Sequence, residues 1–332
     1  MIVKFAMTMK EKINNIRNKK AIFYMMTVIV LLGIIMLIFY TYKSHSIRDK
    51  QDSLEIRVRA MNDFITDFNN DIHRSTRISA TRSLIALEDY VSTSGRYFRN
   101  ISEFNDYFRE VFYYGTINGT NHSLMEDSSF IDYERKVFAN AKNTGFNFYI
   151  NVTKIELYQE DPWNVKVKID AFVKLNDTSK VAYWEFNNSY ITVVPIEGLR
   201  DPIYSINTLG RVQNTIRRSN LPFFVNGTDL SNLLSHINTG YYIESNNAPS
   251  FLMRFYNNLS SSEQGIESIV NINDLYDQGL TIYNSRPVID YKYFSGYYNA
   301  NVCNIQGLPA WFKIQDSDIS VYQISGLNYT SC

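Results

Sequence analysis

The sequence has few of the residues that build catalytic and metal centres. Its 332 residues include two cysteines and four histidines, and the histidines, at positions 45, 73, 122 and 236, do not stand at ligand spacing. The chain contains no His-Glu-x-x-His, paired-cysteine, Gly-x-Ser-x-Gly, phosphate-binding glycine loop or calcium-loop motif. A pair of carboxylates far apart in the chain, as in a glycosidase, needs no motif, so a surface hydrolase is the remaining enzymatic alternative. We predict no enzyme activity, no cofactor and no metal site.

The chain also has no excess of basic residues that could bind nucleic acid. Lysine and arginine number 33 and balance 33 acidic residues. The first 20 residues hold six of the basic residues and one acidic residue, a net charge of +5, so the remaining 312 residues sum to −5. A mildly acidic bulk gives no electrostatic attraction for phosphate backbones, and we predict no nucleic-acid partner.

One long segment near the N-terminus has no charge at all. Residues 21–42 read AIFYMMTVIVLLGIIMLIFYTY, and about 20 such residues in a helix cross the ~30 Å hydrocarbon layer of a bilayer. A cleaved secretory signal is the alternative, but its apolar region normally runs about 7 to 15 residues and ends in a small-x-small site. We therefore predict a transmembrane helix over residues 21–43. By the positive-inside rule, the basic segment 1–20 is cytoplasmic and everything after Lys43 lies outside the cytoplasm.

Two features of the remaining chain agree with an extracytoplasmic location. Asn-x-Ser/Thr sequons, which are possible glycosylation sites, all follow the predicted membrane segment. They are Asn100, Asn118, Asn121, Asn151, Asn176, Asn187, Asn226, Asn258 and Asn328. The two cysteines, Cys303 and Cys332, lie on the same side, where disulfides persist, and we predict that they pair. Two free or intermolecular thiols are the alternative.

A helical stalk is predicted over residues 44–112. No proline occurs between the membrane segment and Pro162, and apolar residues recur at a 4-3-4-3-4 spacing that forms one heptad stripe. The stripe consists of Leu54, Val58, Met61, Ile65, Phe68 and Ile72. It could be an assembly seam against identical neighbours, or it could pack on the chain's own outer domain. Serines at positions 75 and 79 interrupt the stripe and suggest a break in the helix there.

Beyond the stalk, the hydrophobic period changes from that of a helix to the period of two that marks strands. Alternation predicts strands over residues 146–157, with a bulge near Lys154, over 165–175 and over 181–194, joined by turns into an antiparallel meander. The last third is less regular, with helices predicted over 229–237 and 265–278 and strands over 251–256 and 288–294. The predicted fold class is α+β: a long N-terminal membrane and stalk helix, followed by a β-rich extracytoplasmic domain over residues 113–332 with short helices.

The N-terminal region resembles archaeal type IV pilin-like proteins. Lys19-Lys20-Ala21 runs straight into the apolar stretch and is followed by the helical stalk and the β-rich domain. In that family a prepilin peptidase cuts at the cytoplasmic edge of the apolar helix, and the released helices pack into a filament core. The rest of the chain resembles uncharacterised membrane-anchored archaeal surface proteins. The segments that carry this resemblance are 195–204, 248–254, 265–271 and 307–312.

These observations together predict a location and a general role. We expect a single-pass cell-surface structural protein whose partners are the lipid bilayer and either other copies, through the stalk helix, or other surface proteins. A pilin-like subunit is one form of this role. A membrane-tethered receptor or adhesin that binds a glycan or a protein is the alternative.

Overall fold

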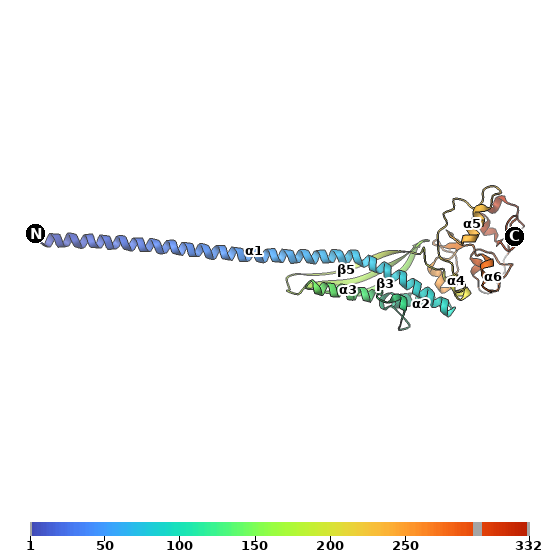
Figure 1. Cartoon of the computed structure of the whole chain (residues 1–332), viewed down its shortest axis with the longest axis horizontal. Helices are drawn as coiled ribbons and strands as arrows, with labels where there is room; N and C mark the ends of the chain where they lie inside the picture. Colours follow the sequence, from blue (N-terminus) through green and yellow to red (C-terminus); the bar gives the residue numbers. More distant parts are fainter. Residues whose placement is uncertain (1, 295–300, 331–332) are drawn as a thin grey trace. The chain divides into compact units, whose positions relative to one another are not determined.

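The computed structural model describes residues 2–294 and 301–330, and for residues 2–20, 46, 47, 49 and 50 it describes the backbone alone. Two compact units divide the chain, one up to Phe64 and one from Ile65, and each is considered by itself. The first unit contains only the N-terminal part of helix α1 (Ile2–Ser94), and the remaining elements belong to the second unit (Figure 1).

The backbone of α1 is helical without interruption from Ile2 to Ser94. The break suggested at residues 75–79 is absent, because Ser79 and Ser83 are buried and their hydroxyls donate to the carbonyls of Ser128 and Ser79, each at 2.7 Å. Small side chains with satisfied hydroxyls let neighbouring segments approach a helix without breaking it. The helix ends where Gly95, at φ 63°, takes the left-handed conformation that glycine adopts at no steric cost.

Two short helices follow, and each begins at a capping side chain. Asn100 accepts a hydrogen bond from the Glu103 amide at the start of α2 (Ile101–Tyr114). Ser129 and Asp132 form a reciprocal capping box at the start of α3 (Phe130–Asn143). Such caps satisfy amides that have no partner within the helix and contribute about 1 kcal/mol each. Between the helices lie β1 (Thr116–Ile117), β2 (Thr120–Asn121) and the 3-10 helix η1 (Ser123–Met125).

A three-stranded antiparallel sheet forms the regular part of the second unit. Strands β3 (Phe146–Asp161), β4 (Asn164–Asp177) and β5 (Tyr183–Pro195) pair in chain order. The β3–β4 register shifts between Val152 and Lys154, where the sequence predicted a bulge. The inward residues of β4 are all buried, namely Val165, Val167, Ile169, Ala171, Val173 and Leu175. Lysines on the opposite face of β4 form ion pairs with neighbouring acids, such as Lys174 with Glu185 at 3.1 Å.

The inner face of this sheet packs on α1 and on the two short helices through aromatic rings. Phe68 of α1 lies 5.0 Å from the Phe148 ring and 6.1 Å from the Tyr190 ring, between centroids. Stacked contacts also join Phe112 of α2 to Phe130 of α3 at 5.5 Å. Such rings bury large areas and favour offset or edge-to-face geometry, so the aromatic residues of this part form a packed core.

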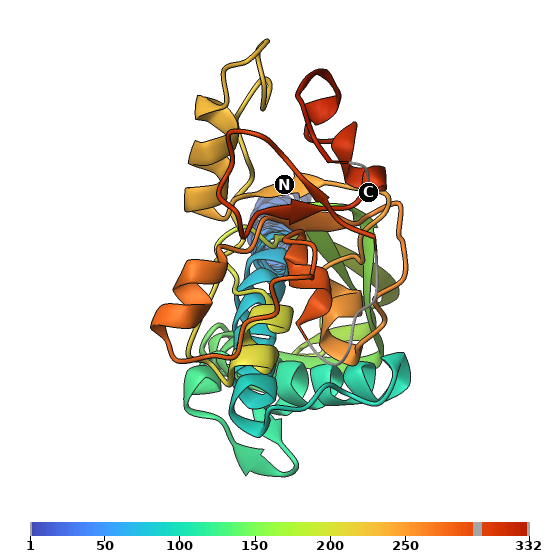
Figure 2. The ribbon, with the colours of Figure 1, turned by 90° about the vertical axis from the view of Figure 1, so that its right-hand side faces the viewer.

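The rest of the second unit consists of short elements joined by loops, which face the viewer in Figure 2, coloured yellow to red. They are α4 (Pro202–Thr208), α5 (Ser231–Thr239), β6 (Tyr242–Glu244), η2 (Leu252–Tyr256), β7 (Ile266–Ser268), α6 (Ile272–Asp277), η3 (Asp290–Tyr293), β8 (Cys303–Asn304), β9 (Lys313–Ile314), α7 (Asp316–Ile319) and η4 (Ile324–Gly326). Strands β6 and β7 pair antiparallel, as do β8 and β9. Buried aliphatic and aromatic side chains from these elements form one core cluster.

Three predicted elements in this region are wrong. The strand predicted over 251–256 is the 3-10 helix η2, the strand predicted over 288–294 contains η3, and the helix predicted over 265–278 is divided between β7 and α6. Each run is short and largely buried, so its apolar residues do not reveal a period. At Gly265 an added Cβ would lie 2.2 Å from two backbone oxygens, so close chain packing sets the local structure there.

Candidate functional sites: an apolar helix and a buried charge network

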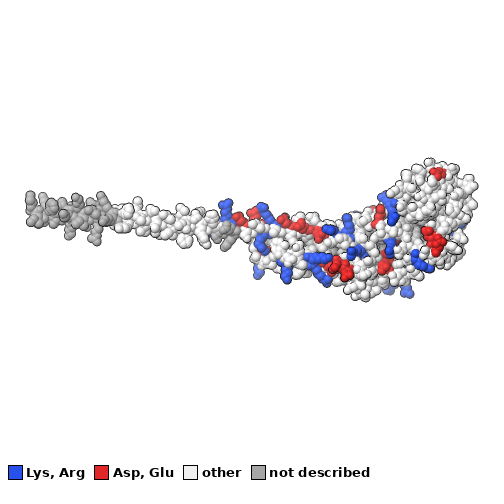
Figure 3. All heavy atoms as spheres, in the orientation of Figure 1, with Lys and Arg blue, Asp and Glu red and all other residues white. Residues whose placement is uncertain are grey.

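The apolar segment of α1 is the first candidate site. Within Ala21–His45, an 18-residue window has a mean hydropathy of 2.8, and all side chains of the segment are exposed in the isolated chain. The segment spans about 37 Å at ~1.5 Å per residue, which exceeds the ~30 Å hydrocarbon layer. Figure 3 shows most of it as a white stretch without blue or red side chains, and Lys43 lies near its C-terminal end. By length and composition, it is the one helix among the described residues that could cross a membrane.

The two threonines in this segment are compatible with a hydrocarbon environment. The Thr27 hydroxyl donates to the Phe23 carbonyl at 2.8 Å, and the Thr41 hydroxyl donates to the Leu37 and Ile38 carbonyls. A hydroxyl bonded to its own helix leaves no donor unsatisfied when water is absent. Tyr24 and Tyr40 lie near the two ends, where amphipathic rings prefer the membrane interface.

The heptad stripe becomes more buried along its length. Leu54 is exposed, Val58 and Ile65 are half-buried, and Met61, Phe68 and Ile72 are buried. At Phe68 the contacts come from the same chain, through the rings of Phe148 and Tyr190. The C-terminal end of the stripe therefore packs within the protein, and a contact between copies at Leu54 stays a prediction.

The sequon asparagines lie where a glycan could be attached. All except Asn176, which is half-buried, are exposed. Asn100 uses its side-chain oxygen to cap α2, and the Asn118 oxygen accepts from the Tyr107 hydroxyl at 2.9 Å. Both contacts use the oxygen, which leaves the amide nitrogen available for attachment. Of the two cysteines, Cys303 is buried in β8 and Cys332 lies outside the described residues, so their pairing stays a prediction.

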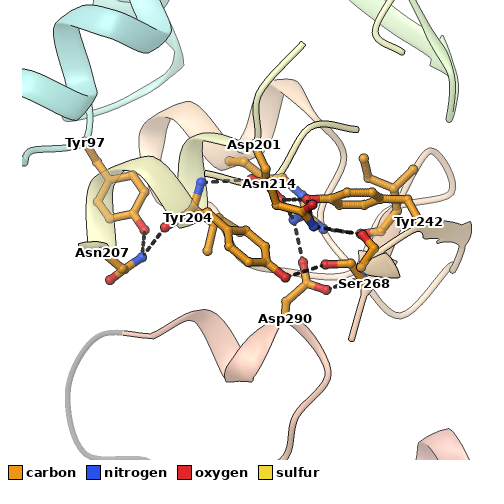
Figure 4. A network of polar contacts seen from close by, with 12 residues as sticks. Tyr97, Asp201, Tyr204, Asn207, Asn214, Tyr242, Ser268 and Asp290 are labelled. Carbon is orange, nitrogen blue, oxygen red and sulfur yellow. Dashed lines mark hydrogen bonds and ion pairs between the residues drawn. The ribbon is translucent and has the colours of Figure 1, made fainter. Parts of the chain in front are cut away.

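A second candidate site is a network of charges buried in the second unit (Figure 4). The Arg254 side chain is fully buried, and its Nη1 donates to Asp201 Oδ2 at 2.6 Å and to Asp290 Oδ2. Its Nη2 donates to the Ile266 carbonyl. The Tyr242 hydroxyl donates to Asp201 Oδ2 at 2.8 Å. One guanidinium thus joins segments that lie far apart in the chain.

Backbone amides complete the coordination of the two carboxylates. Asp201 caps α4 by accepting from the Ile203 amide at 2.8 Å, and Asp290 accepts from the Ser268 amide at 2.6 Å. Asp290 also begins five consecutive residues with positive φ, a conformation that costs non-glycine residues energy. The strained turn is retained because it holds the Asp290 carboxylate beside Arg254.

Burial and charge pull the pKa values of the network in different directions. Burial raises the pKa of Asp290, although Arg254 opposes that shift. Burial alone would lower the pKa of Arg254, but Asp201 and Asp290 raise it. The guanidinium therefore stays charged. Because removing one partner from a buried pair leaves an uncompensated charge, the network is strongly interdependent.

Glu267 and His236 are buried ionisable groups of the same unit that have unsatisfied polar atoms. Glu267 is 2% exposed, and its Oε1 accepts no hydrogen bond from residues 2–294 or 301–330. Burial raises the pKa of Glu267 to about 7. Neither ring nitrogen of His236 has a hydrogen-bond partner among the described residues, and burial lowers its pKa to about 4. The His236 ring packs edge-on against Phe224 at 4.9 Å. His236 is thus a neutral core residue.

The other histidines are spread through the structure. His45 is exposed, His73 Nδ1 lies 3.1 Å from the Thr192 hydroxyl, and His122 Nε2 lies 3.4 Å from Asp89. No group of three or more His, Cys, Asp or Glu side chains within the described part of the chain could hold a metal ion. The sequence did not reveal the network around Arg254, because its members are separated by up to 89 positions and form no motif.

Scans of protein-family models and searches of curated proteins and solved structures found no match to this chain. The function must therefore be argued from the sites themselves.

Proposed function

We propose that the protein is a single-pass, membrane-anchored structural component of the cell surface. The observation that carries the proposal is the 25-residue segment Ala21–His45, which is helical and exposed along its whole length and has no charged residue before Lys43. A helix of this hydropathy in water would expose a large apolar surface, whereas a bilayer covers it. A soluble protein would bury such a helix in its own core.

The proposed orientation places residues 1–20 in the cytoplasm and the second unit outside it. The net charge of +5 before the helix supports this direction through the positive-inside rule. The exposure of eight of the nine sequon asparagines is compatible with glycosylation on the outer side. In this arrangement residues 44–112 serve as a stalk, and the β3–β5 sheet is the meander of the outer domain.

Anchoring is tested by alkaline carbonate extraction of membranes. The wild-type protein should stay in the membrane pellet, whereas the double variant Leu32→Arg/Ile35→Arg should be extracted. Each arginine at the centre of a spanning helix costs about 3 kcal/mol on insertion scales. The control is Ile56→Arg, which is exposed on the same helix beyond the apolar segment and should remain in the pellet. Wild-type protein in the supernatant would refute the anchor.

Orientation and assembly need separate measurements. Protease added to intact cells should digest the chain after Lys43 and leave a small anchored stub, whereas full protection of the outer domain would refute the orientation. The structural role covers two forms, a fixed surface protein and a pilin-like subunit that self-associates through the N-terminal helix. Sheared material that sediments as filaments would identify the pilin-like form.

A further inference from the structure

A cavity of about 430 Å³ lies in the second unit. It forms between the last turns of α1, η1, the loop that joins β5 to α4, and the residue before η2. Its wall includes Leu84, Glu88, Leu124, Leu199, Arg200 and Phe251. The volume lies in the range of small-molecule sites, and the wall combines apolar side chains with the charged groups of Glu88, Asp89 and Arg200.

The apolar part of the wall is rigid on one side and open on the other. Leu84, Leu199 and Phe251 are buried in the protein core, so their positions are fixed by packing. Leu124 is 41% exposed and lies at the rim. At Gly198 an added Cβ would meet no atom within 4 Å, so the loop does not fill the cavity. An alkyl or aromatic group of a ligand could displace water from this wall.

The polar part of the wall centres on a carboxylate with an incomplete set of partners. Glu88 is 3% exposed, and its Oε1 accepts from the Ser205 hydroxyl at 2.5 Å. Its Oε2 lies 3.7 Å from Arg200 Nη1, which is beyond hydrogen-bond distance. Within the described part of the chain, Oε2 accepts no hydrogen bond and its charge is met by this longer ion pair with Arg200. Burial raises the pKa of Glu88, as expected for a carboxylate with too few donors.

We propose that this cavity binds a small molecule that carries a primary ammonium group on a short apolar body. The ammonium donates to Glu88 Oε2, and the apolar body packs on Leu84, Leu199 and Phe251. Two acidic residues, Glu88 and Asp89, and one basic residue, Arg200, line the cavity. This balance favours a cation over a carboxylate ligand. The proposal does not depend on the membrane-anchored role.

The test is a calorimetric titration of the full-length protein in lipid nanodiscs with benzylamine, benzyl alcohol and benzoate. These probes share a ring and differ in the polar group. Benzylamine should bind at least tenfold more tightly than the other two. Glu88→Gln should lower benzylamine affinity at least tenfold and leave benzyl alcohol unchanged, while Glu263→Gln, an exposed acid outside the cavity, should change neither.

A second variant keeps the test valid if Glu88→Gln does not fold. Leu124→Trp places a larger ring at the exposed rim, so it should block benzylamine without changing the core. The proposal is overturned if benzylamine does not bind, if benzyl alcohol or benzoate binds as tightly, or if both variants retain wild-type affinity.

Discussion

Replacing Glu267 by glutamine should change how the stability of the second unit depends on pH. Glu267 lies on β7, opposite Ile243 of β6, and its carboxyl is almost completely buried. Burial is the largest cause of its raised pKa, the Ser245 side chain opposes the shift, and the charges of Asp290 and Asp318 add to it. Glutamine keeps the shape of the side chain and removes its charge.

The sign of the effect follows from the two pKa values. Below the unfolded value of 4.5, Glu267 is protonated in both states and its charge costs nothing. As the pH rises towards the folded value of about 7, the unfolded state ionises while the folded state resists, so stability falls. A rise of the pKa from 4.5 to about 7 corresponds to a loss of about 3 kcal/mol in the free energy of unfolding. This loss is complete above pH 7.

The measurement is urea unfolding of the full-length protein in nonionic detergent, followed by tryptophan fluorescence, at several values between pH 4 and 8. The difference in free energy of unfolding between Glu267→Gln and wild type should be about 3 kcal/mol more favourable to the variant at pH 8 than at pH 4.5. His236 offers an internal comparison of opposite sign. Its pKa is lowered from 6.5 to about 4, so it destabilises the fold as the pH falls through that range, and His236→Phe should remove that loss. If Glu267→Gln parallels wild type at every pH, the buried carboxyl is not the titrating group.

Three further tests probe other parts of the structure by unfolding or mass measurements. Arg254→Met leaves two buried carboxylates unpaired and should cost about 3 to 5 kcal/mol in urea unfolding, and a loss below 1 kcal/mol would refute the role of the network. Met61→Asp buries an unpaired charge and should lower the free energy of unfolding by several kcal/mol. Leu54→Asp, at an exposed position of the same stripe, should not affect unfolding. A lower oligomer mass in Leu54→Asp would show that Leu54 contacts another copy. Mass spectrometry without reduction should show Cys303 linked to Cys332. The bridge would close a loop of about 30 residues and stabilise the fold by about 3.6 kcal/mol through the lower chain entropy of the unfolded state. Two alkylated thiols would exclude the bridge.

The sequence predicted best the features that depend on local pattern. The uncharged run from Ala21 is an apolar helix, and the alternation along β4 places its inward residues in the core. The shift near Lys154 appears in the register because an inserted residue changes the phase of the alternation. Each of these features is set by neighbours within a few positions, which is why a single sequence reveals them.

The features that sequence reasoning missed depend on contacts between distant residues. Glu88 and Ser205 are separated by 117 positions, and no motif links them. The Phe251–Tyr256 segment forms a 3-10 helix and not the predicted strand. Most of its residues are buried and the run is short, so its apolar residues do not show the period that would have indicated a helix. Packing between distant residues sets both the Glu88–Ser205 contact and the structure of the Phe251–Tyr256 segment. Intrinsic strand propensity is too weak to override such packing.

The Arg254 network also explains how a region with so little regular structure holds together. From α4 onward the strands are two or three residues long, so backbone pairing can fix only short stretches of the chain. Arg254 binds the start of α4 through Asp201, the strand β7 through the Ile266 carbonyl, and the turn at η3 through Asp290. Because each of these groups is buried, separating the segments would expose the apolar cluster and leave charges unpaired at the same time. The loops of this region should therefore unfold together when Arg254 is replaced, and the β3–β5 sheet, which has its own backbone ladder and core, should keep its amide protons protected from exchange.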